Sequence, residues 1–248
     1  MWVSPKSTRF RLRRWQKLAG WINWVLNVYP LLRPCLNTLF NKIASKSQRE
    51  QYLRINNDLR GDFSWALHTL ALILPVHLLD SLSWAPTDAT TTIYCDACPT
   101  GMGFWIPSCN QGYVASPPLE APKLIFYLEE LCVLSALQWA CQHGPPQGRI
   151  VLYTDNLNSV DIFSSLRCQP AFNWMLKASV TLRLSIKALL RVLHVPGEQN
   201  EVADALSRDD FDHARSLSPG IQIGHFVPAC ESRPLFQPSQ FKLGVASL

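Results

Sequence analysis

The chain has 248 residues, of which 48% are hydrophobic and 17% charged, so it can form one large or two small domains and is not a largely disordered polymer. The net charge of +5 is unevenly spread: residues 1–60 contain 12 Lys and Arg against Glu50 and Asp58, and the remainder contains 11 against 16 acidic residues. A basic part joined to an acidic part suggests a polyanion-binding region beside a metal-holding region. The alternative is a solvated basic tail.

Residues 1–82 are predicted to be helical. The apolar residues of 15–26 recur at spacings of three and four, and Pro30 and Pro34 interrupt the pattern. We expect the three tryptophans of this stretch, Trp15, Trp21 and Trp24, to be core residues and not base-stacking ones. A further helix is predicted to start at Asp62 as its N-cap. Residues 83–90 are polar and Pro-containing, and are expected to be a linker.

Residues 91–208 are predicted to form an α/β domain. A β-branched strand at 91–98 is followed by two short pieces up to residue 115, which together suggest an antiparallel meander. The remaining elements are predicted as a helix at 122–143, a strand at 150–155, helices at 156–166 and 171–184, a strand at 188–195 and a short helix at 200–208. The order is βββαβααβα, which indicates a five-stranded mixed sheet flanked by helices. Residues 209–248 are rich in Pro, Ser and Gly, and we expect a poorly ordered tail.

Two apolar runs, 18–32 and 63–79, resemble membrane segments in composition. Both are shorter than the roughly 20 residues that a spanning helix needs, and both contain polar or Pro residues. No cleavage signature of a signal peptide follows the first run. We therefore expect buried helices and no membrane association, with a signal anchor as the alternative.

Eight cysteines raise the question of disulfides or a zinc site. Cys95 and Cys98 form a C-x-x-C pair, but no second pair follows at the spacing of a zinc finger. Cys132 and Cys141 lie in a helical pattern. We expect reduced core thiols and hence an intracellular protein, in the cytoplasm or nucleus.

Four acidic residues occupy four separate landmarks of the predicted domain. Asp96 and Asp155 each end a strand, Glu129 lies in the long helix, and Asp204 lies in the last helix. If the two strands are neighbours, their carboxylates emerge at the same edge of the sheet. Carboxylates on different elements can hold two divalent ions, which hydrolysis of a phosphodiester commonly uses. Asp155 alone could instead cap the following helix.

Four segments resemble the retroelement branch of the ribonuclease H family, in gypsy-like and DIRS-like elements. They are TIYCDACPTGMGFW, FYLEELCVLSALQWA, VLYTDNLNSVDIF and LHVPGEQNEVADALSR, within residues 91–208. The resemblance implies an RNase H-like fold and an endonuclease that cleaves the RNA strand of RNA–DNA hybrids with two Mg²⁺ ions, for which Mn²⁺ could substitute. It also implies that Asp96, Glu129, Asp155 and Asp204 hold the metals.

The resemblance decides one point that periodicity leaves open. Glu129 and Glu130 are adjacent, and the family pattern E-x-L-x-V-x-x-A-L favours Glu129, which makes Glu130 an exposed neighbour. Gly101, Asn158 and Ser159 are suggested to contact the hybrid, with 2′-hydroxyls distinguishing the RNA strand.

The segment RRWQKLAGWINWVLNVYPLLRPCLNTLF resembles the thumb and connection region of DIRS-like reverse transcriptases. It implies that residues 1–82 are a remnant of that region and that the polymerase part of a reverse transcriptase is a partner. Its basic run would follow a nucleic-acid backbone. The competing hypothesis is a module of the same origin that has lost catalysis and only binds nucleic acid.

Overall fold

The computed structural model of the chain describes residues 9–44, 46, 51–71, 84–119, 121–122 and 124–229. They pack as two compact units. Of the described residues, those within 9–71 and 166–177 form the first unit, and those within 84–165 and 178–229 form the second. The helical region predicted at 1–82 therefore gains a later segment of the chain, and Trp84 of the predicted linker is buried in the second unit.

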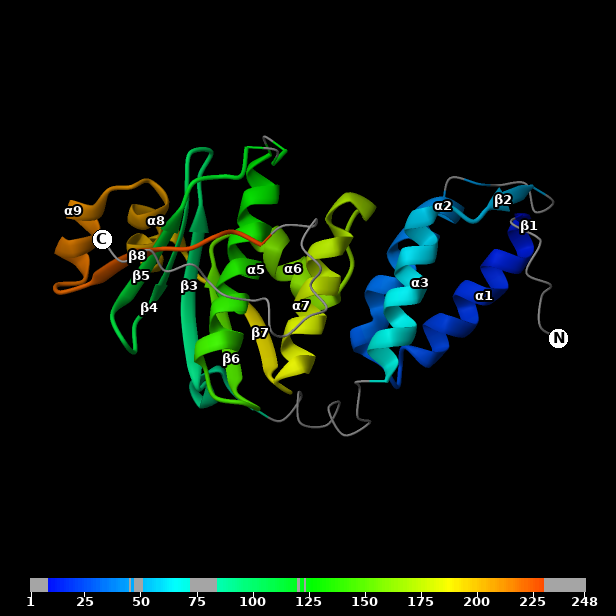
Figure 1. Cartoon of the computed structure of the whole chain (residues 1–248), viewed down its shortest axis with the longest axis horizontal. Coiled ribbons are helices and arrows are strands. Elements are labelled where there is room, and N and C mark those ends of the chain that lie inside the picture. Colours follow the sequence, from blue (N-terminus) through cyan, green and yellow to red (C-terminus); the bar gives the residue numbers. More distant parts are fainter. Residues whose placement is uncertain are drawn as a thin grey trace. The chain divides into compact units, whose positions relative to one another are not determined.

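The first unit is mainly helical (Figure 1). Its elements in chain order are β1 (Arg9–Arg11), α1 (Leu12–Val25), η1 (Pro30–Leu36), α2 (Asn37–Ala44), β2 (Tyr52–Arg54), α3 (Asn57–Leu70) and η3 (Pro170–Phe172). The short strands β1 and β2 pair antiparallel. Helix α1 ends before Pro30, as the proline pattern predicts.

Asp62 does not cap a helix, so that prediction is wrong. The cap of α3 is Asn56, whose side chain accepts a hydrogen bond from the backbone N–H of Leu59 at 3.3 Å. Asp62 lies inside α3, where it is buried and accepts a hydrogen bond from Lys177 at 2.8 Å. It also accepts from the side-chain amide of Asn173. The segment 166–177 is thus joined to α3 by buried polar contacts.

The prediction for the tryptophans of α1 is correct for Trp15 and wrong for the other two. Trp15 is 4% exposed, whereas Trp21 is 78% and Trp24 is 72% exposed. The buried stripe of α1 contains Leu12, Trp15 and Ala19. Nearly every position of the C-terminal half of α1 is apolar, so apolar residues at spacings of three and four can be found on more than one face of the helix. The spacing therefore does not identify the buried face.

The second unit is built on a six-stranded mixed sheet (Figure 1). Its elements in chain order are η2 (Pro86–Asp88), β3 (Thr91–Ala97), β4 (Met102–Ile106), β5 (Gln111–Ala115), α5 (Ile125–His143), β6 (Arg149–Thr154), α6 (Leu157–Ser165), the helix α7 (Asn173–Ser185), whose first turn belongs to the first unit, β7 (Leu189–His194), η4 (Gly197–Gln199), α8 (Glu201–Ser207), α9 (Phe211–Leu217) and β8 (Gln222–His225). The predicted order βββαβααβα and the α/β class are confirmed.

The strand order is β7-β6-β3-β4-β5-β8. Strands β3, β4 and β5 form the predicted antiparallel meander, and β6 and β7 extend it as parallel neighbours of β3. The sixth strand, β8, pairs parallel with β5. It lies in the stretch expected to be a disordered tail, so for residues 209–229 that expectation is wrong.

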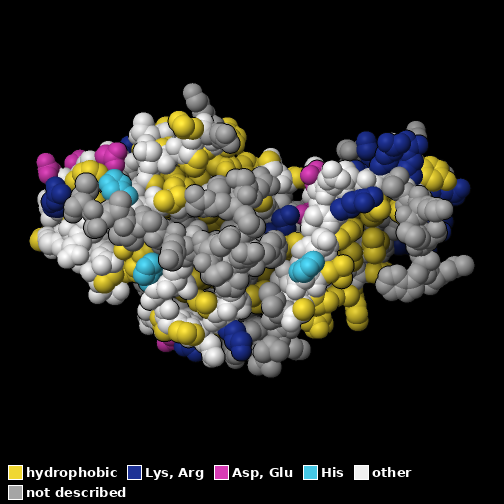
Figure 2. Space-filling model, in the orientation of Figure 1, with side chains coloured by type: hydrophobic (Ala, Val, Ile, Leu, Met, Phe, Trp, Pro, Cys, Tyr) yellow, Lys and Arg dark blue, Asp and Glu magenta, His cyan; other side chains and the backbone are white. Residues whose placement is uncertain are grey.

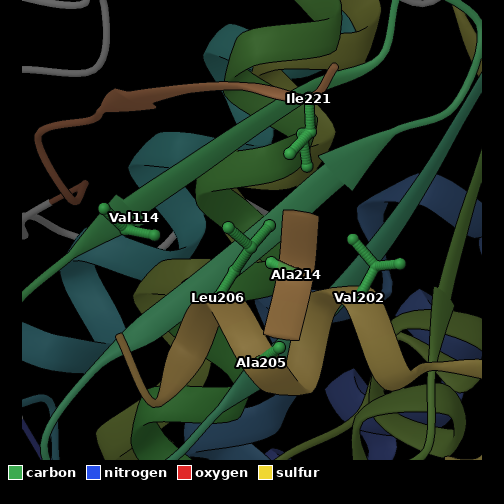
Figure 3. Packing of buried hydrophobic residues seen from close by; sticks show 6 residues of the cluster. All are labelled: Val114, Val202, Ala205, Leu206, Ala214 and Ile221. Atoms are coloured by element: carbon green, nitrogen blue, oxygen red, sulfur yellow. The ribbon is translucent and has the colours of Figure 1, made fainter. Parts of the chain in front are cut away.

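Helices cover both faces of the sheet. Helix α5 lies on one face, and α8 with α9 lies on the other (Figure 1). Figure 3 shows the core beneath α8 and α9, where Leu206 and Ala205 of α8 pack with Val114 of β5, Ala214 of α9 and Ile221. This packing requires α9 and the chain leading to β8, which explains why the order continues past residue 208.

Charge is segregated on the face shown in Figure 2. Lys and Arg side chains gather over β1 and β2 in the first unit, and Asp and Glu side chains gather over α9 in the second. This matches the uneven charge of the sequence. The seven cysteines of the described residues are free; four of them are buried, whereas Cys109 is exposed. Among the helices that the structure describes, none has the length and apolar character needed to cross a bilayer.

Candidate metal centre

The centre begins at the carboxyl ends of two neighbouring strands. Strands β3 and β6 pair in parallel, with Tyr94 opposite Tyr153. Asp96 and Asp155 each follow that pair by two residues, so both stand at the same level at one edge of the sheet. The two strands are therefore neighbours, which is the condition for their carboxylates to emerge at the same edge of the sheet.

Helix α5 adds a third carboxylate. One oxygen each of Asp96, Glu129 and Asp155 can be chosen so that all three lie within 4.8 Å of one another. Asp96 and Glu129 are buried, and Asp155 is exposed. The structure thus brings Glu129 into the group, as the sequence pattern favoured. Glu130 lies outside the group and is fully buried, so the expectation that it is exposed is wrong.

Asp155 does not serve as a helix cap. The side chain of Asn156 caps α6, accepting hydrogen bonds from the backbone N–H groups of Asn158 at 2.9 Å and Ser159 at 3.2 Å. The helix start therefore does not use the carboxylate of Asp155 as a hydrogen-bond acceptor for these two N–H groups. Gly197 of η4 lies close to it, since a Cβ at this glycine would be 3.6 Å from Asp155 Oδ2.

The environment of Glu129 and Asp96 favours their protonated forms. Burial raises the pKa of Glu129 to about 9, with further contributions from the charges of Asp96 and Asp155. Burial also raises the pKa of Asp96 to about 6, and the charges of Asp155 and Asp204 act in the same direction. Glu129 Oε2 is buried and has no hydrogen-bond partner among the described residues. A cation would stabilise the charged forms and provide that missing contact.

Asp204 is near the group without being part of it. It lies on α8, its side chain is 43% exposed, and its Oδ1 accepts a hydrogen bond from Arg208 Nε at 2.8 Å. Its charge acts on Asp96, which places it in the same electrostatic environment. The three-membered group among the described residues does not include it.

Two residues that support the centre were not singled out from the sequence. Asn200 is buried and donates from Nδ2 to the backbone carbonyl of Cys95 at 3.0 Å, which joins the start of α8 to β3 beside Asp96. Ser207 donates to Asp96 Oδ2 at 2.5 Å. Both lie in the quoted segment LHVPGEQNEVADALSR. The motif was the available signal, but it does not say which of its polar residues point inward.

The residues suggested to contact a hybrid differ in accessibility. Asn158 is exposed, but Ser159 is fully buried and Gly101 is buried. A Cβ at Gly101 would collide with the backbone carbonyl of Ser207. Close packing of α8 therefore explains glycine at this position without a ligand, and contact between Gly101 or Ser159 and nucleic acid stays a prediction.

The donor set is suited to a hard divalent cation. All three candidate ligands are carboxylates, and Mg²⁺ and Mn²⁺ prefer such oxygen ligands over softer ligands such as thiolates. The unpartnered Oε2 of Glu129 and the raised pKa values of Glu129 and Asp96 fit such an ion. Cys98, although nearby in sequence, donates from its thiol to the carbonyl of Ser207 at 3.0 Å and is not a member of the group.

Comparisons with known proteins give structural matches only. No protein-family model matches the sequence, and no curated protein matches it. RNase H1 from the halophilic archaeon Halobacterium salinarum aligns over 49% of this chain and 97% of its own, with 18% identity and a TM-score of 0.39. LC11-RNase H1 in complex with an RNA/DNA hybrid aligns over 52% and 99%, with 16% identity and a TM-score of 0.40.

A third solved structure extends over more of the chain. The foamy viral protease-reverse transcriptase dRH, in complex with double-stranded DNA, aligns over 78% of this chain and 35% of its own. The identity is 11% and the TM-score is 0.32. The aligned part of this chain therefore spans about a third of the length of that protein.

Proposed function

We propose that the chain is a ribonuclease H that cleaves the RNA strand of RNA–DNA hybrids with Mg²⁺, as part of a retrotransposon reverse transcriptase. The observation that supports this most directly is the group formed by Asp96, Glu129 and Asp155, with oxygens within 4.8 Å of one another at the edge of the sheet. The segments around these residues resemble the retroelement ribonucleases H, and the order βββαβααβα agrees with that resemblance.

In this proposal the residues of the centre hold metal and position the hybrid. Asp96 and Glu129, both buried, would hold cations from the protein side, and Asp155 would hold them at the exposed side where a phosphate arrives. Asp204 would complete the set from α8. Divalent cations bound there would supply an activated water and stabilise the leaving oxygen. Without cations, the ionised carboxylates of the centre would repel the anionic backbone of the substrate.

Asn158 is the suggested contact to the hybrid. It is exposed on the first turn of α6, three residues after Asp155. Its amide has both donors and acceptors and is able to bind a 2′-hydroxyl, the group that distinguishes RNA from DNA. Gly101 and Ser159 would contribute through their backbone or by supporting the neighbouring segments.

The first unit is proposed to be the thumb- and connection-like remnant of a reverse transcriptase, with the polymerase part as a partner. Its helical content and basic residues support this proposal. The described residues 9–44 contain no acidic side chain, and Arg13, Arg14 and Lys17 are exposed on α1. Reversing Arg13 and Arg14 to Glu should weaken binding to a hybrid and flatten its salt dependence. Unchanged binding would argue against a nucleic-acid role for this unit.

The function is tested by cleavage of a labelled RNA–DNA hybrid with Mg²⁺ and with EDTA. We expect cleavage of the RNA strand that requires the metal and is lost in Asp155→Asn. A suitable control is Asp212→Asn, which alters a fully exposed carboxylate paired with Arg215 on α9. Robust cleavage by Asp155→Asn would refute the assignment.

The same assay separates the competing hypothesis. A module that has lost catalysis would bind the hybrid in a filter or fluorescence-anisotropy assay and leave it uncut at every Mg²⁺ or Mn²⁺ concentration. Binding without cleavage in the wild-type chain would therefore replace the nuclease proposal with the binding proposal.

A further inference from the structure

Ser207 connects two of the acidic residues through one hydroxyl. It is the last residue of α8 and is fully buried. Its Oγ lies 2.5 Å from Asp96 Oδ2 and 2.9 Å from the backbone carbonyl oxygen of Asp204. A serine hydroxyl has a single proton and can donate to one acceptor at a time. A carboxylate is the stronger acceptor, so the ionised form of Asp96 takes this hydrogen bond.

The backbone of Ser207 is fixed against the β3–β4 hairpin. A Cβ at Gly103 would lie 2.6 Å from the backbone nitrogen of Ser207, and one at Gly101 would collide with its carbonyl oxygen. The thiol of Cys98 donates to the same carbonyl oxygen at 3.0 Å. The backbone that carries the hydroxyl is therefore fixed by the hairpin of β3, the strand of Asp96, and β4, and not only by its own helix.

We propose that Ser207 is a positioning residue for the metal centre. It holds Oδ2 of Asp96 and thereby fixes the orientation of this carboxylate within the group. Because Ser207 and Asp204 are on the same helix, the same contact sets α8 against β3. This inference rests on the proposed metal-dependent function and adds to it a residue that does not itself contact the metal.

Other groups near Asp96 do not provide an equivalent contact. Asn200 donates to the carbonyl of Cys95, and Arg208 donates to Asp204. Among the hydrogen bonds that the structure gives for the described residues, the one from Ser207 is the one that reaches the Asp96 carboxylate. Removing the hydroxyl would leave a buried carboxylate oxygen without a donor and free the carboxylate to rotate.

The test measures Mn²⁺ binding to the full chain without nucleic acid, by calorimetry or by electron paramagnetic resonance. Loss of a residue that orients a metal ligand typically lowers metal affinity by roughly 10- to 100-fold. We expect Ser207→Ala to weaken Mn²⁺ binding by about 10-fold or more on that basis. Its cleavage activity should be largely restored at high metal concentration, because the ligands themselves remain.

The matched control is Ser135→Ala. Ser135 is also a buried serine, and it donates to the carbonyl of Leu131 at 2.7 Å within α5. We expect its Mn²⁺ affinity to equal that of the wild type. Should Ser207→Ala not fold, as judged by circular dichroism, Ser207→Cys replaces it, because the thiol keeps the size of the side chain and is a weaker donor.

The outcomes are distinguishable. If Ser207→Ala binds Mn²⁺ as tightly as the wild type, or if Ser135→Ala loses affinity equally, the positioning role is refuted whatever the nuclease assay gives. If the wild type binds Mn²⁺ but leaves the hybrid intact, the nuclease proposal fails, while the affinities of the two variants still decide the role of Ser207. A wild type without Mn²⁺ binding would refute both.

Discussion

The buried carboxyl of Glu130 should make the free energy of unfolding depend on pH. Its carboxyl lies in α5, is fully buried, and has no hydrogen-bond partner among the described residues. Burial raises its pKa from 4.5 to about 8. In the unfolded chain the group ionises at its ordinary pKa, so between pH 4.5 and 8 the folded state binds a proton that the unfolded state has released. The free energy of unfolding therefore falls as the pH rises through that range.

The size of the effect follows from the two pKa values. A shift of this size lowers the free energy of unfolding by about 3 kcal/mol at pH 7 and by about 1 kcal/mol at pH 5. Glu130→Gln keeps the shape of the side chain but cannot ionise. We expect the stability of this variant relative to the wild type to increase by about 2 kcal/mol between pH 5 and pH 7. Comparing two pH values removes the constant contribution of burying an amide.

The assay is urea denaturation followed by tryptophan fluorescence at pH 5, 6, 7 and 8. Asp161→Asn, which removes an exposed carboxylate on α6, is the reference for the loss of one acidic side chain. The reasoning would be refuted if the stability curves of Glu130→Gln and the wild type ran parallel from pH 5 to pH 8.

Three further predictions concern packing, the centre and the first unit. Gly103→Ala should destabilise the fold by roughly 1–3 kcal/mol or more in thermal denaturation, because its Cβ would meet the backbone of Ser207 at 2.6 Å. Its control is Gly61→Ala, at an open position inside α3, which should stabilise the fold by roughly 0.5–1 kcal/mol. Binding of Mn²⁺ should release protons near pH 7, since the raised pKa of Glu129 keeps that carboxyl protonated until a cation binds. Calorimetry in buffers of different ionisation enthalpy measures the number of protons released. Metal binding without proton release would contradict the prediction. Replacing Trp21 and Trp24 with Phe should remove the fluorescence that acrylamide quenches most readily, whereas Trp15→Phe should leave it; equal quenching in both variants would contradict the exposure of α1.

Much of the second unit was predictable because its strands and long helix are continuous apolar runs. Asp96 and Asp155 could be placed at strand ends, and the pairing of β3 with β6 then brought them together. Helical periodicity could not choose between Glu129 and Glu130, because α5 is buried on nearly all sides and has no polar face to set its phase. The choice came from the family pattern.

Other features left little trace in the sequence. Strand β8 has four residues, of which Ile223 is the only large apolar one, so no alternation announces it. Ser207 and Asn200 act through single hydrogen bonds whose partners are more than 100 residues away, and local patterns contain no information about such contacts. The exposure of Trp21 and Trp24 depends on the phase of α1, which its largely apolar second half does not define.

The two units are interleaved along the chain and not arranged one after the other. The backbone leaves the second unit after Ser165, contributes residues 166–177 to the first, and returns within α7. Asn173 and Lys177 are the residues of this excursion that hold Asp62. No single cut of the polypeptide can therefore separate the units, and a fragment starting near residue 91 would keep a piece of the first unit without its partners. Any recombination, fusion or expression boundary that treats residues 1–82 as a detachable module would leave Asn173 and Lys177 without Asp62.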